Sequence, residues 1–112
     1  MPDSRFLTGY RIIDLSQYIP GPFATRLLAD HGAEVIKIEP PHGDPMRHFL
    51  KPEGDTPSPL YRHLNRGKKI VRLDLKTDAG KALFTRLLAS ADVLLESFRP
   101  GVMARLGFGR ET

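Results

Sequence analysis

The sequence contains neither cysteine nor tryptophan among its 112 residues. The absence of cysteine excludes a disulfide scaffold, a zinc site with cysteine ligands and a thiol nucleophile. Apolar runs are short as well. None exceeds three residues, as in Val93-Leu94-Leu95, whereas a membrane span needs about 20 predominantly apolar residues. The first ten residues lack the apolar segment of a secretory signal. A hydrophobic fraction of 40% nevertheless permits a core, so we expect a soluble, intracellular α/β chain.

Positive charge is concentrated in the second half of the chain. Residues 1–59 carry 6 cationic and 8 acidic side chains, whereas residues 60–112 carry 11 and 5. The densest stretch, residues 62–76, holds six lysines and arginines against Asp74 alone. A basic stretch favours an anionic partner. Nucleic acid, an anionic membrane surface, a phosphorylated cofactor and a solvated basic face without a partner all remain open at this point.

The apolar periodicity predicts two strand–helix–strand units in series. Strands are expected at residues 10–15, 34–38, 69–75 and 92–96. A first helix is expected at 20–31, with Gly32 as its C-terminal cap, and a second begins after the N-cap Thr77. The expected core stripe of that second helix comprises Ala79, Ala82, Leu83, Leu87 and Leu88. With a short helix at 99–106, this order predicts a mostly parallel sheet flanked by helices.

Residues 40–59 interrupt this pattern because they hold six of the ten prolines. We expect neither helix nor strand at that proline density. A segment of this length without regular structure is usually functional or flexible. It could serve as a lid or be a surface loop without chemistry.

The carboxyl ends of the strands are the place where open α/β sheets bind ligands. Segments 16–22, 39–47 and 96–101 lie there, and the first and third have a Pro-Gly pair at an expected helix start. Helix N-termini attract phosphate and carboxylate groups. With Lys76, Arg99 and Arg105 nearby, the sequence suggests an anion site, unless the Pro-Gly pairs only make tight turns.

Other chemistry finds little support in the sequence. The G-x-G-x-x-G pattern of a dinucleotide site is absent after the first strand. The four histidines lack metal-ligand spacing, and Ser16 lacks the context of a nucleophile elbow. Glu39 and Asp44 could form a carboxylate pair, but the interpretation favoured here is that both are surface carboxylates. We therefore expect no metal and assign no catalytic residue.

Several motifs, taken together and in order, resemble the class III CoA-transferases of the CaiB/BaiF type, a family that also contains the α-methylacyl-CoA racemases. The resemblance covers residues 8–110 and rests on these segments: Asp14-Leu15-Ser16-Gln17, Pro20-Gly21-Pro22-Phe23-Ala24, 28–41, Gly43-Asp44-Pro45-Met46-Arg47, Asn65-Arg66-Gly67-Lys68-Lys69, Leu73-Asp74-Leu75-Lys76-Thr77 and 92–102.

The resemblance implies a Rossmann-like α/β domain that binds CoA, within a larger subunit that forms an interlocked homodimer. Residues 1–112 would be the incomplete N-terminal part of that domain. The implied reaction moves CoA between an acyl-CoA and a carboxylic acid through an aspartate beyond residue 112. A racemase of the same family is the first alternative. A stand-alone module that binds anions or nucleic acid is the second.

The resemblance also implies CoA-binding positions, although Ser97, Pro20 and Pro40 depart from residues common in the family. The implied CoA-binding residues are Tyr18, Ile19, Leu73, Lys76, Ser97, Phe98, Arg99, Val102 and Arg105. CoA is then the only cofactor, and neither nucleic acid nor a membrane is an expected partner. The implied location is the cytoplasm.

Overall fold

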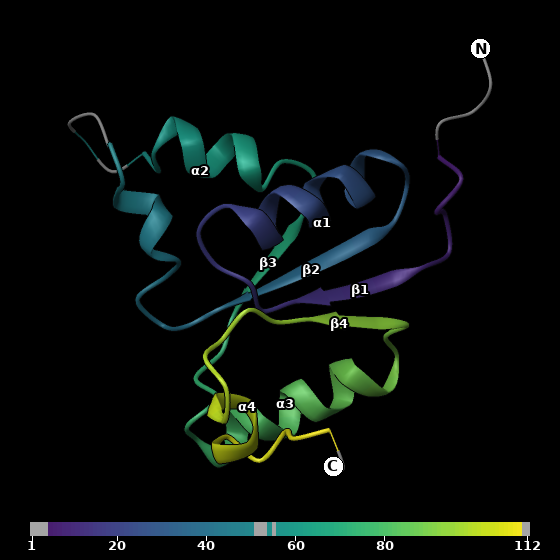
Figure 1. The fold of residues 1–112 in the computed structure, drawn as a ribbon, viewed down its shortest axis with the longest axis vertical. Helices are drawn as coiled ribbons and strands as arrows, with labels where there is room; N and C mark the ends of the chain where they lie inside the picture. The colour runs from purple at the N-terminus through teal and green to yellow at the C-terminus, as the bar shows by residue number, and fades with distance from the viewer. Residues whose placement is uncertain (1–4, 51–53, 55, 111–112) are drawn as a thin grey trace.

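A parallel sheet of four strands forms the centre of the computed structural model, which describes residues 5–50, 54 and 56–110 (Figure 1). The strands are β1 (Arg11–Asp14), β2 (Glu34–Glu39), β3 (Lys69–Arg72) and β4 (Val93–Leu95), in the order β3-β2-β1-β4. All three strand pairs are parallel. The chain therefore moves outward from β1 to β3 and then returns to place β4 on the other side of β1. This arrangement confirms the predicted parallel sheet with flanking helices.

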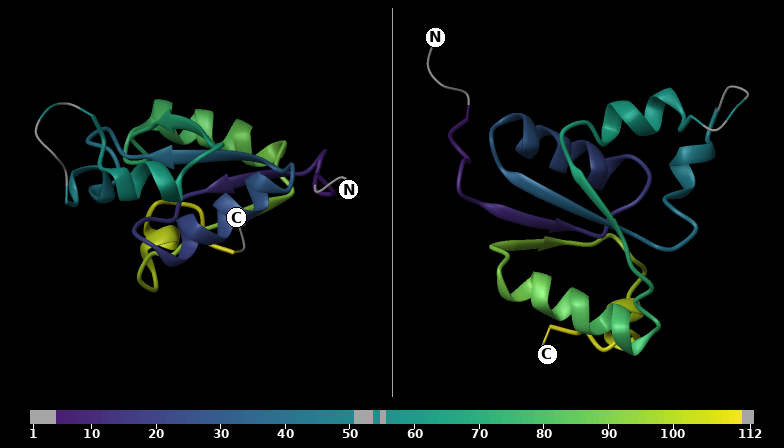
Figure 2. Two further views of the ribbon diagram at one scale, coloured as in Figure 1. Left: turned by 90° about the horizontal axis from the view of Figure 1, so that it is seen from above. Right: turned by 180° about the vertical axis from the view of Figure 1, so that it is seen from behind.

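The helices lie on both faces of the sheet. They are α1 (Pro20–Asp30), the 3₁₀ helix η1 (Pro45–His48), α2 (Pro59–Leu64), α3 (Asp78–Ala89) and α4 (Val102–Arg105). Figure 2 shows α1 and α3 on opposite sides of the strands. The predicted caps are present, because the Thr77 hydroxyl accepts a hydrogen bond from the Gly80 N–H and Gly32 has φ +103°.

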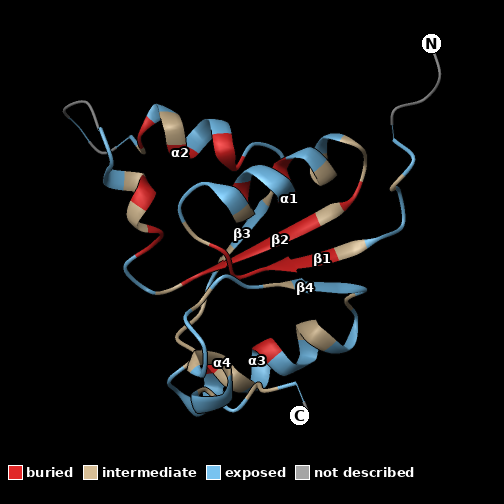
Figure 3. Cartoon of the chain, in the orientation of Figure 1, coloured by how far each residue is buried: buried red, intermediate tan, exposed pale blue. Residues whose placement is uncertain are grey.

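Alternate residues of β1 and β2 supply two hydrophobic clusters, one on each face. Ile13 and Ile36 pack with Phe84 on the α3 side, whereas Ile12 and Val35 pack with Leu28 and Ala33 on the α1 side. Figure 3 shows the buried residues gathered on β1 and β2, while β4 is exposed. The two central strands thus form the core.

The inward face of α3 differs from the prediction. Ala79, Ala82 and Leu83 are exposed, and the buried stripe comprises Gly80 and Phe84, with Leu87 and Leu88 partly buried. Phe84 is completely buried and makes an edge-to-face contact with Phe108. The face of α3 that packs on the sheet is therefore shifted by about one residue from the predicted stripe. Burying the Phe84 ring removes more apolar area from water than burying the alanines of that stripe would.

Three predicted boundaries need correction. Residues 40–59 were expected to hold no helix, yet η1 lies within them and α2 begins at Pro59, with Ser58 as its N-cap; residues 51–53 and 55 of that segment lie outside the described residues. The strand expected at 69–75 ends at Arg72, because its ladder partner Glu39 is the last residue of β2. The helix expected at 99–106 is a single turn, α4.

Glu39 and Asp44 are buried rather than surface carboxylates. Both have zero relative exposure. The Asp44 carboxylate lies 2.6 Å from the Lys37 ammonium, and the Glu39 carboxylate lies 2.7 Å from the Arg47 guanidinium. Each acid is thus paired with a cation, as buried charges require.

Candidate functional site

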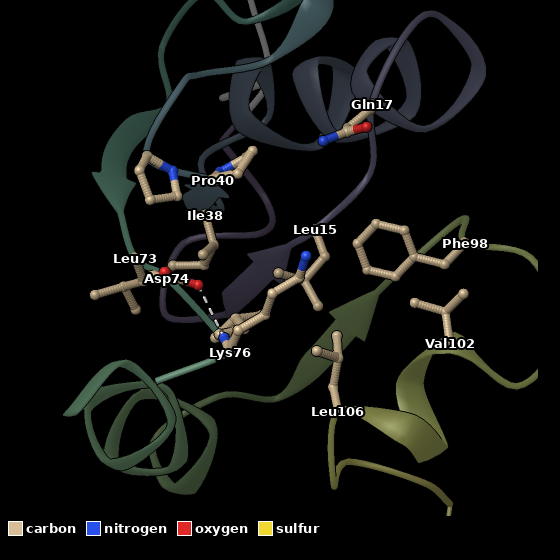
Figure 4. A pocket seen from close by; sticks show the side chains of 12 residues that line it. Leu15, Gln17, Ile38, Pro40, Leu73, Asp74, Lys76, Phe98, Val102 and Leu106 are labelled. Atoms are coloured by element: carbon tan, nitrogen blue, oxygen red, sulfur yellow. Dashed lines mark hydrogen bonds between the residues drawn. The ribbon is translucent and has the colours of Figure 1, made fainter. Parts of the chain in front are cut away.

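A cavity of about 210 Å³ opens at the carboxyl ends of the four strands (Figure 4). Four separate stretches of chain line it, each at or after the carboxyl end of one strand. The lining residues are Leu15, Gln17, Ile38, Pro40, Pro41, Leu73, Asp74, Leu75, Lys76, Phe98, Val102 and Leu106. We call this cavity the carboxyl-edge pocket.

The pocket lies where the sheet topology changes direction. One connection leaves β1 toward β2, whereas β4 reaches the opposite side of β1 after crossing from β3. A crevice forms between strands whose connections diverge in this way, and open α/β sheets bind ligands in it. In Figure 4, Leu15 and Ile38 lie between a wall that includes Pro40 and Leu73 and a wall that includes Phe98 and Val102.

The turn that precedes α3 places the polar groups of the pocket. The Asp74 carboxylate accepts a hydrogen bond from the Lys76 N–H at 3.0 Å, and the Asp74 carbonyl accepts one from the Thr77 hydroxyl at 2.9 Å. Gly80 packs directly on this turn, because a Cβ there would lie 2.0 Å from the Asp74 carbonyl oxygen. The start of α3 thus holds Lys76 at the pocket, where its exposed ammonium can meet an anion.

The structure brings together four of the nine residues that the resemblance implied. Leu73, Lys76, Phe98 and Val102 all line the carboxyl-edge pocket. The remaining five do not line it: Tyr18, Ile19, Ser97, Arg99 and Arg105. Tyr18 and Ile19 are 55% and 51% exposed, and the other three are exposed as well.

The anion site predicted at the second Pro-Gly pair, Pro100-Gly101, has weaker support than expected. The helix that follows, α4, has four residues and begins at Val102 after Gly101, whose φ is +88°. Few peptide dipoles add up in a single turn, so the attraction for an anion is small. Lys76 is therefore the cation that the pocket itself provides.

Several lining residues were not identified from the sequence. Gln17 and Pro41 lie within the segments 16–22 and 39–47, which were placed at the carboxyl edge, but neither residue was itself selected. Leu15, Ile38 and Leu106 were assigned only to elements. Which of these residues face the cavity depends on the strand order, which the sequence pattern does not reveal.

A group of buried charges lies beneath α2, on the α1 side of the sheet. The Lys68 ammonium lies 3.1 Å from the Asp14 carboxylate. The Asn65 side-chain oxygen accepts hydrogen bonds from both Lys68 and Lys37, at 2.8 and 3.1 Å. Burial lowers the pKa of Lys68 to about 8, and the attraction of Asp14 offsets only part of this effect. A signal for this group exists in the sequence, because Asp14, Lys37 and Glu39 occupy same-face positions of otherwise apolar strands.

The described ranges, 5–50, 54 and 56–110, contain no group of three or more histidine, aspartate or glutamate side chains placed to hold a metal ion. Within the same ranges, no helix combines the length and apolar character required to cross a bilayer.

Known proteins resemble this chain in sequence and in structure. The family model described as CoA-transferase family III matches residues 7–112. An acetyl-CoA:oxalate CoA-transferase of Acetobacter aceti is 48% identical over 104 residues, which cover 92% of this chain and 26% of that protein. A succinyl-CoA–D-citramalate CoA-transferase of Chloroflexus aurantiacus is 44% identical, covering 96% of this chain and 27% of the relative.

Solved structures agree with the fold described above. The crystal structure of a hypothetical protein from Mycobacterium tuberculosis superposes with a TM-score of 0.86 at 42% identity, covering 96% of this chain and 29% of that one. A CAIB/BAIF family protein from Brucella suis gives a TM-score of 0.87 at 34% identity, with 95% and 29% covered. The chain spans little more than a quarter of the length of these relatives. Because the family model matches nearly the whole sequence, we conclude that the chain belongs to CoA-transferase family III.

Proposed function

We propose that this chain forms part of the CoA-binding site of a CoA-transferase, and that the carboxyl-edge pocket receives a portion of the CoA molecule. The observation that carries the proposal is the convergence of four strand-end segments on one mainly apolar pocket, in a chain of this family. Ligand pockets usually measure about 300–1,000 Å³, so a cavity of about 210 Å³ can take only a part of CoA.

The lining residues suggest that one part of CoA binds inside the pocket and another part binds at its rim. Phe98, Leu15 and Ile38 offer aromatic and aliphatic surface suited to the adenine ring or the pantetheine arm. Asp74 adds a negative charge to the wall, which disfavours phosphate inside the cavity. We therefore place the phosphates at the exposed rim near Lys76, with Arg99 and Arg105 as further candidates. Tyr18, Ile19 and Ser97 remain predicted contacts.

We infer that the complete enzyme transfers CoA from an acyl-CoA to a carboxylic acid. In the proposed mechanism, an aspartate outside residues 1–112 forms a bond from its carboxylate oxygen to the acyl carbon, and the carbon–sulfur bond breaks to release the CoA thiolate. The thiolate then attacks the aspartyl carbonyl of the mixed anhydride, which frees the original acyl group as a carboxylate. The incoming acid reverses these steps.

The relatives favour transfer over racemisation. The two curated relatives described above are named for CoA transfer to oxalate or citramalate. A racemase would instead exchange the α-proton of a bound acyl-CoA through an acid–base pair. The interlocked homodimer and the cytoplasmic location stay predictions.

Calorimetric titration of the 112-residue chain with CoA tests the proposed site. We expect Lys76→Ala and Phe98→Ala each to weaken binding by about 1–3 kcal/mol, through a lost charge contact and lost ring contact respectively. Arg86→Ala, an exposed change on α3 outside the pocket lining, is the matched control and should leave the affinity unchanged. Equal affinities for all four proteins would remove the carboxyl-edge pocket from the site. Tighter binding of a short DNA duplex that collapses as salt is raised would favour the stand-alone module.

A further inference from the structure

Glu39 is a completely buried acid next to the carboxyl-edge pocket in the sequence, yet it does not line it. It ends β2 and directly precedes Pro40, a lining residue. Its side chain points to the α1 side of the sheet, where it is completely buried. A buried carboxylate requires hydrogen-bond or ion-pair partners, and the identity of these partners shows which parts of the chain Glu39 fixes in place.

Three groups donate hydrogen bonds to the Glu39 carboxylate. Arg47 donates from Nε at 2.7 Å and from Nη2 at 3.1 Å, the Tyr61 hydroxyl donates to Oε2, and the Asp44 N–H donates at 2.9 Å. Arg47 also donates to the Tyr61 hydroxyl at 2.8 Å and stacks over the Tyr61 ring at 4.3 Å. Burial alone would raise the pKa of Glu39, but these donors outweigh burial and lower it. The carboxylate is thus saturated by protein groups and has no acceptor position left for a ligand.

These contacts close the chain segment that carries Pro40 and Pro41. Glu39 stands before the segment, and the Asp44 N–H and Arg47 stand after it, so the carboxylate joins its two ends. Within the segment, the Gly43 N–H donates to the Pro40 carbonyl at 2.8 Å. Gly43 has φ +86°, and a Cβ there would lie 3.0 Å from Arg47 Cδ, so the turn fits closely against the arginine.

We propose that Arg47 and Tyr61 are positioning residues for the CoA site: acting through Glu39, they fix the Pro40–Pro41 wall of the carboxyl-edge pocket. Neither residue lines the pocket. They lie on η1 and α2, and each donates a hydrogen bond to this carboxylate at the end of β2. The inference rests on the proposed function, because it assumes that the pocket binds CoA. It adds that binding depends on charge contacts on the opposite face of β2.

The test measures CoA affinity and amide exchange at Gly43 in a set of variants of the 112-residue chain. Tyr61→Phe removes one hydroxyl and keeps the ring, and Arg47→Met removes every donor at that position. We expect dissociation constants raised about five- to tenfold for Tyr61→Phe and further for Arg47→Met, since a loosened wall must be ordered upon binding. Arg47→Lys keeps the charge without the paired donors and should restore part of the affinity lost in Arg47→Met.

Two controls separate positioning from general destabilisation. Arg11→Gln breaks the exposed ion pair with Glu34, 3.0 Å apart at the opposite edge of the sheet. Ile12→Val trims the hydrophobic cluster on the α1 side. We expect both controls to bind CoA like the wild type. Amide exchange at Gly43 provides a second readout and should accelerate in the Arg47 and Tyr61 variants only.

Each outcome decides the inference. Unchanged CoA affinity in Tyr61→Phe and Arg47→Lys would overturn the positioning role, whether or not exchange at Gly43 becomes faster, and would leave the proposed function intact. An equal loss of CoA affinity in Ile12→Val would show that the loss comes from general destabilisation, and would also overturn the positioning role. A wild-type chain that does not bind CoA would contradict the proposed function itself, and the inference with it. If Arg47→Met does not fold, the two conservative variants decide.

Discussion

At the scale of single residues, the most informative feature is a group of charged side chains that are completely buried on the α1 side of the sheet. Asp14, Lys37, Asp44 and Lys68 have side chains with no exposed area, and they form two ion pairs bridged by Asn65. Removing one member of such a pair leaves an uncompensated charge, which is strongly destabilising. We interpret the group as the polar support that seats α2 and the residues after it against the sheet.

Lys68 gives this group a pH dependence with a definite sign. The folded chain releases the Lys68 proton near pH 8, whereas the unfolded chain keeps it to about pH 10.5. Between these values the unfolded state binds more protons, so this residue makes the folded state more stable as the pH rises. Between pH 7 and pH 9.5, Lys68 should raise the free energy of unfolding by about 2 kcal/mol. Below pH 7 this contribution is absent.

Urea unfolding at pH 7 and pH 9.5, for the wild type and for Lys68→Met, measures the gain as a difference between the two proteins. The Lys68 ¹³Cε resonance checks the same claim without a variant, because it should titrate near pH 8. A resonance that stays constant up to pH 10 would contradict the assigned origin of the effect.

At the scale of helices and strands, close packing between α3 and the turn before it sets one wall of the carboxyl-edge pocket. Gly80 permits this approach, since any Cβ would collide with the Asp74 carbonyl oxygen. Alanine is otherwise favoured over glycine in a helix by about 1 kcal/mol. Whether Gly80→Ala stabilises or destabilises the chain therefore depends on the cost of the collision.

We expect Gly80→Ala to lower the free energy of unfolding by about 1–3 kcal/mol, because the collision is with backbone rather than with a flexible side chain. Thr85→Ala, an exposed change one turn further along α3, should be neutral or slightly stabilising. Chemical denaturation of both variants checks the pair. A stabilised Gly80→Ala chain would show that the turn and the helix can separate without cost.

The strands and the two long helices were predictable to within a few residues, since the strands are marked by short apolar runs and the helices by an apolar period and a terminal cap. The helix α2 was missed because it has six residues and follows a proline-rich stretch, although Ser58 and Pro59 form a recognisable N-cap and first position. The buried carboxylates were missed because Glu39 and Asp44 were taken as solvated, and their cation partners lie elsewhere in the sequence. For the same reason the site was only partly predictable: Phe98 and Val102 come from motifs, whereas Gln17 and Pro41 join them only once the strand order is known.

At the scale of the whole molecule, the described part of the chain presents the carboxyl-edge pocket and several exposed apolar surfaces. Val93 and Leu94 on the edge strand β4 are 49% and 37% exposed, and Phe23 and Leu27 on α1 are 43% and 39% exposed. Such surfaces commonly mark interfaces. The matched region makes up 26% and 29% of the lengths of two of the relatives, so we propose that the complete enzyme buries part of this area and supplies the reacting aspartate.

The central claim is that the carboxyl edge of this sheet binds CoA, and a nuclear magnetic resonance titration of the isotope-labelled chain tests it most directly. We predict that CoA shifts the amide resonances of Gln17, Leu73, Lys76 and Phe98, which come from three separate stretches and meet only at the carboxyl-edge pocket. Resonances of Gly9, Gly32 and Ser90, at the opposite edge of the sheet, should stay in place. Shifts confined to that opposite edge, or no shifts at saturating CoA, would contradict the account.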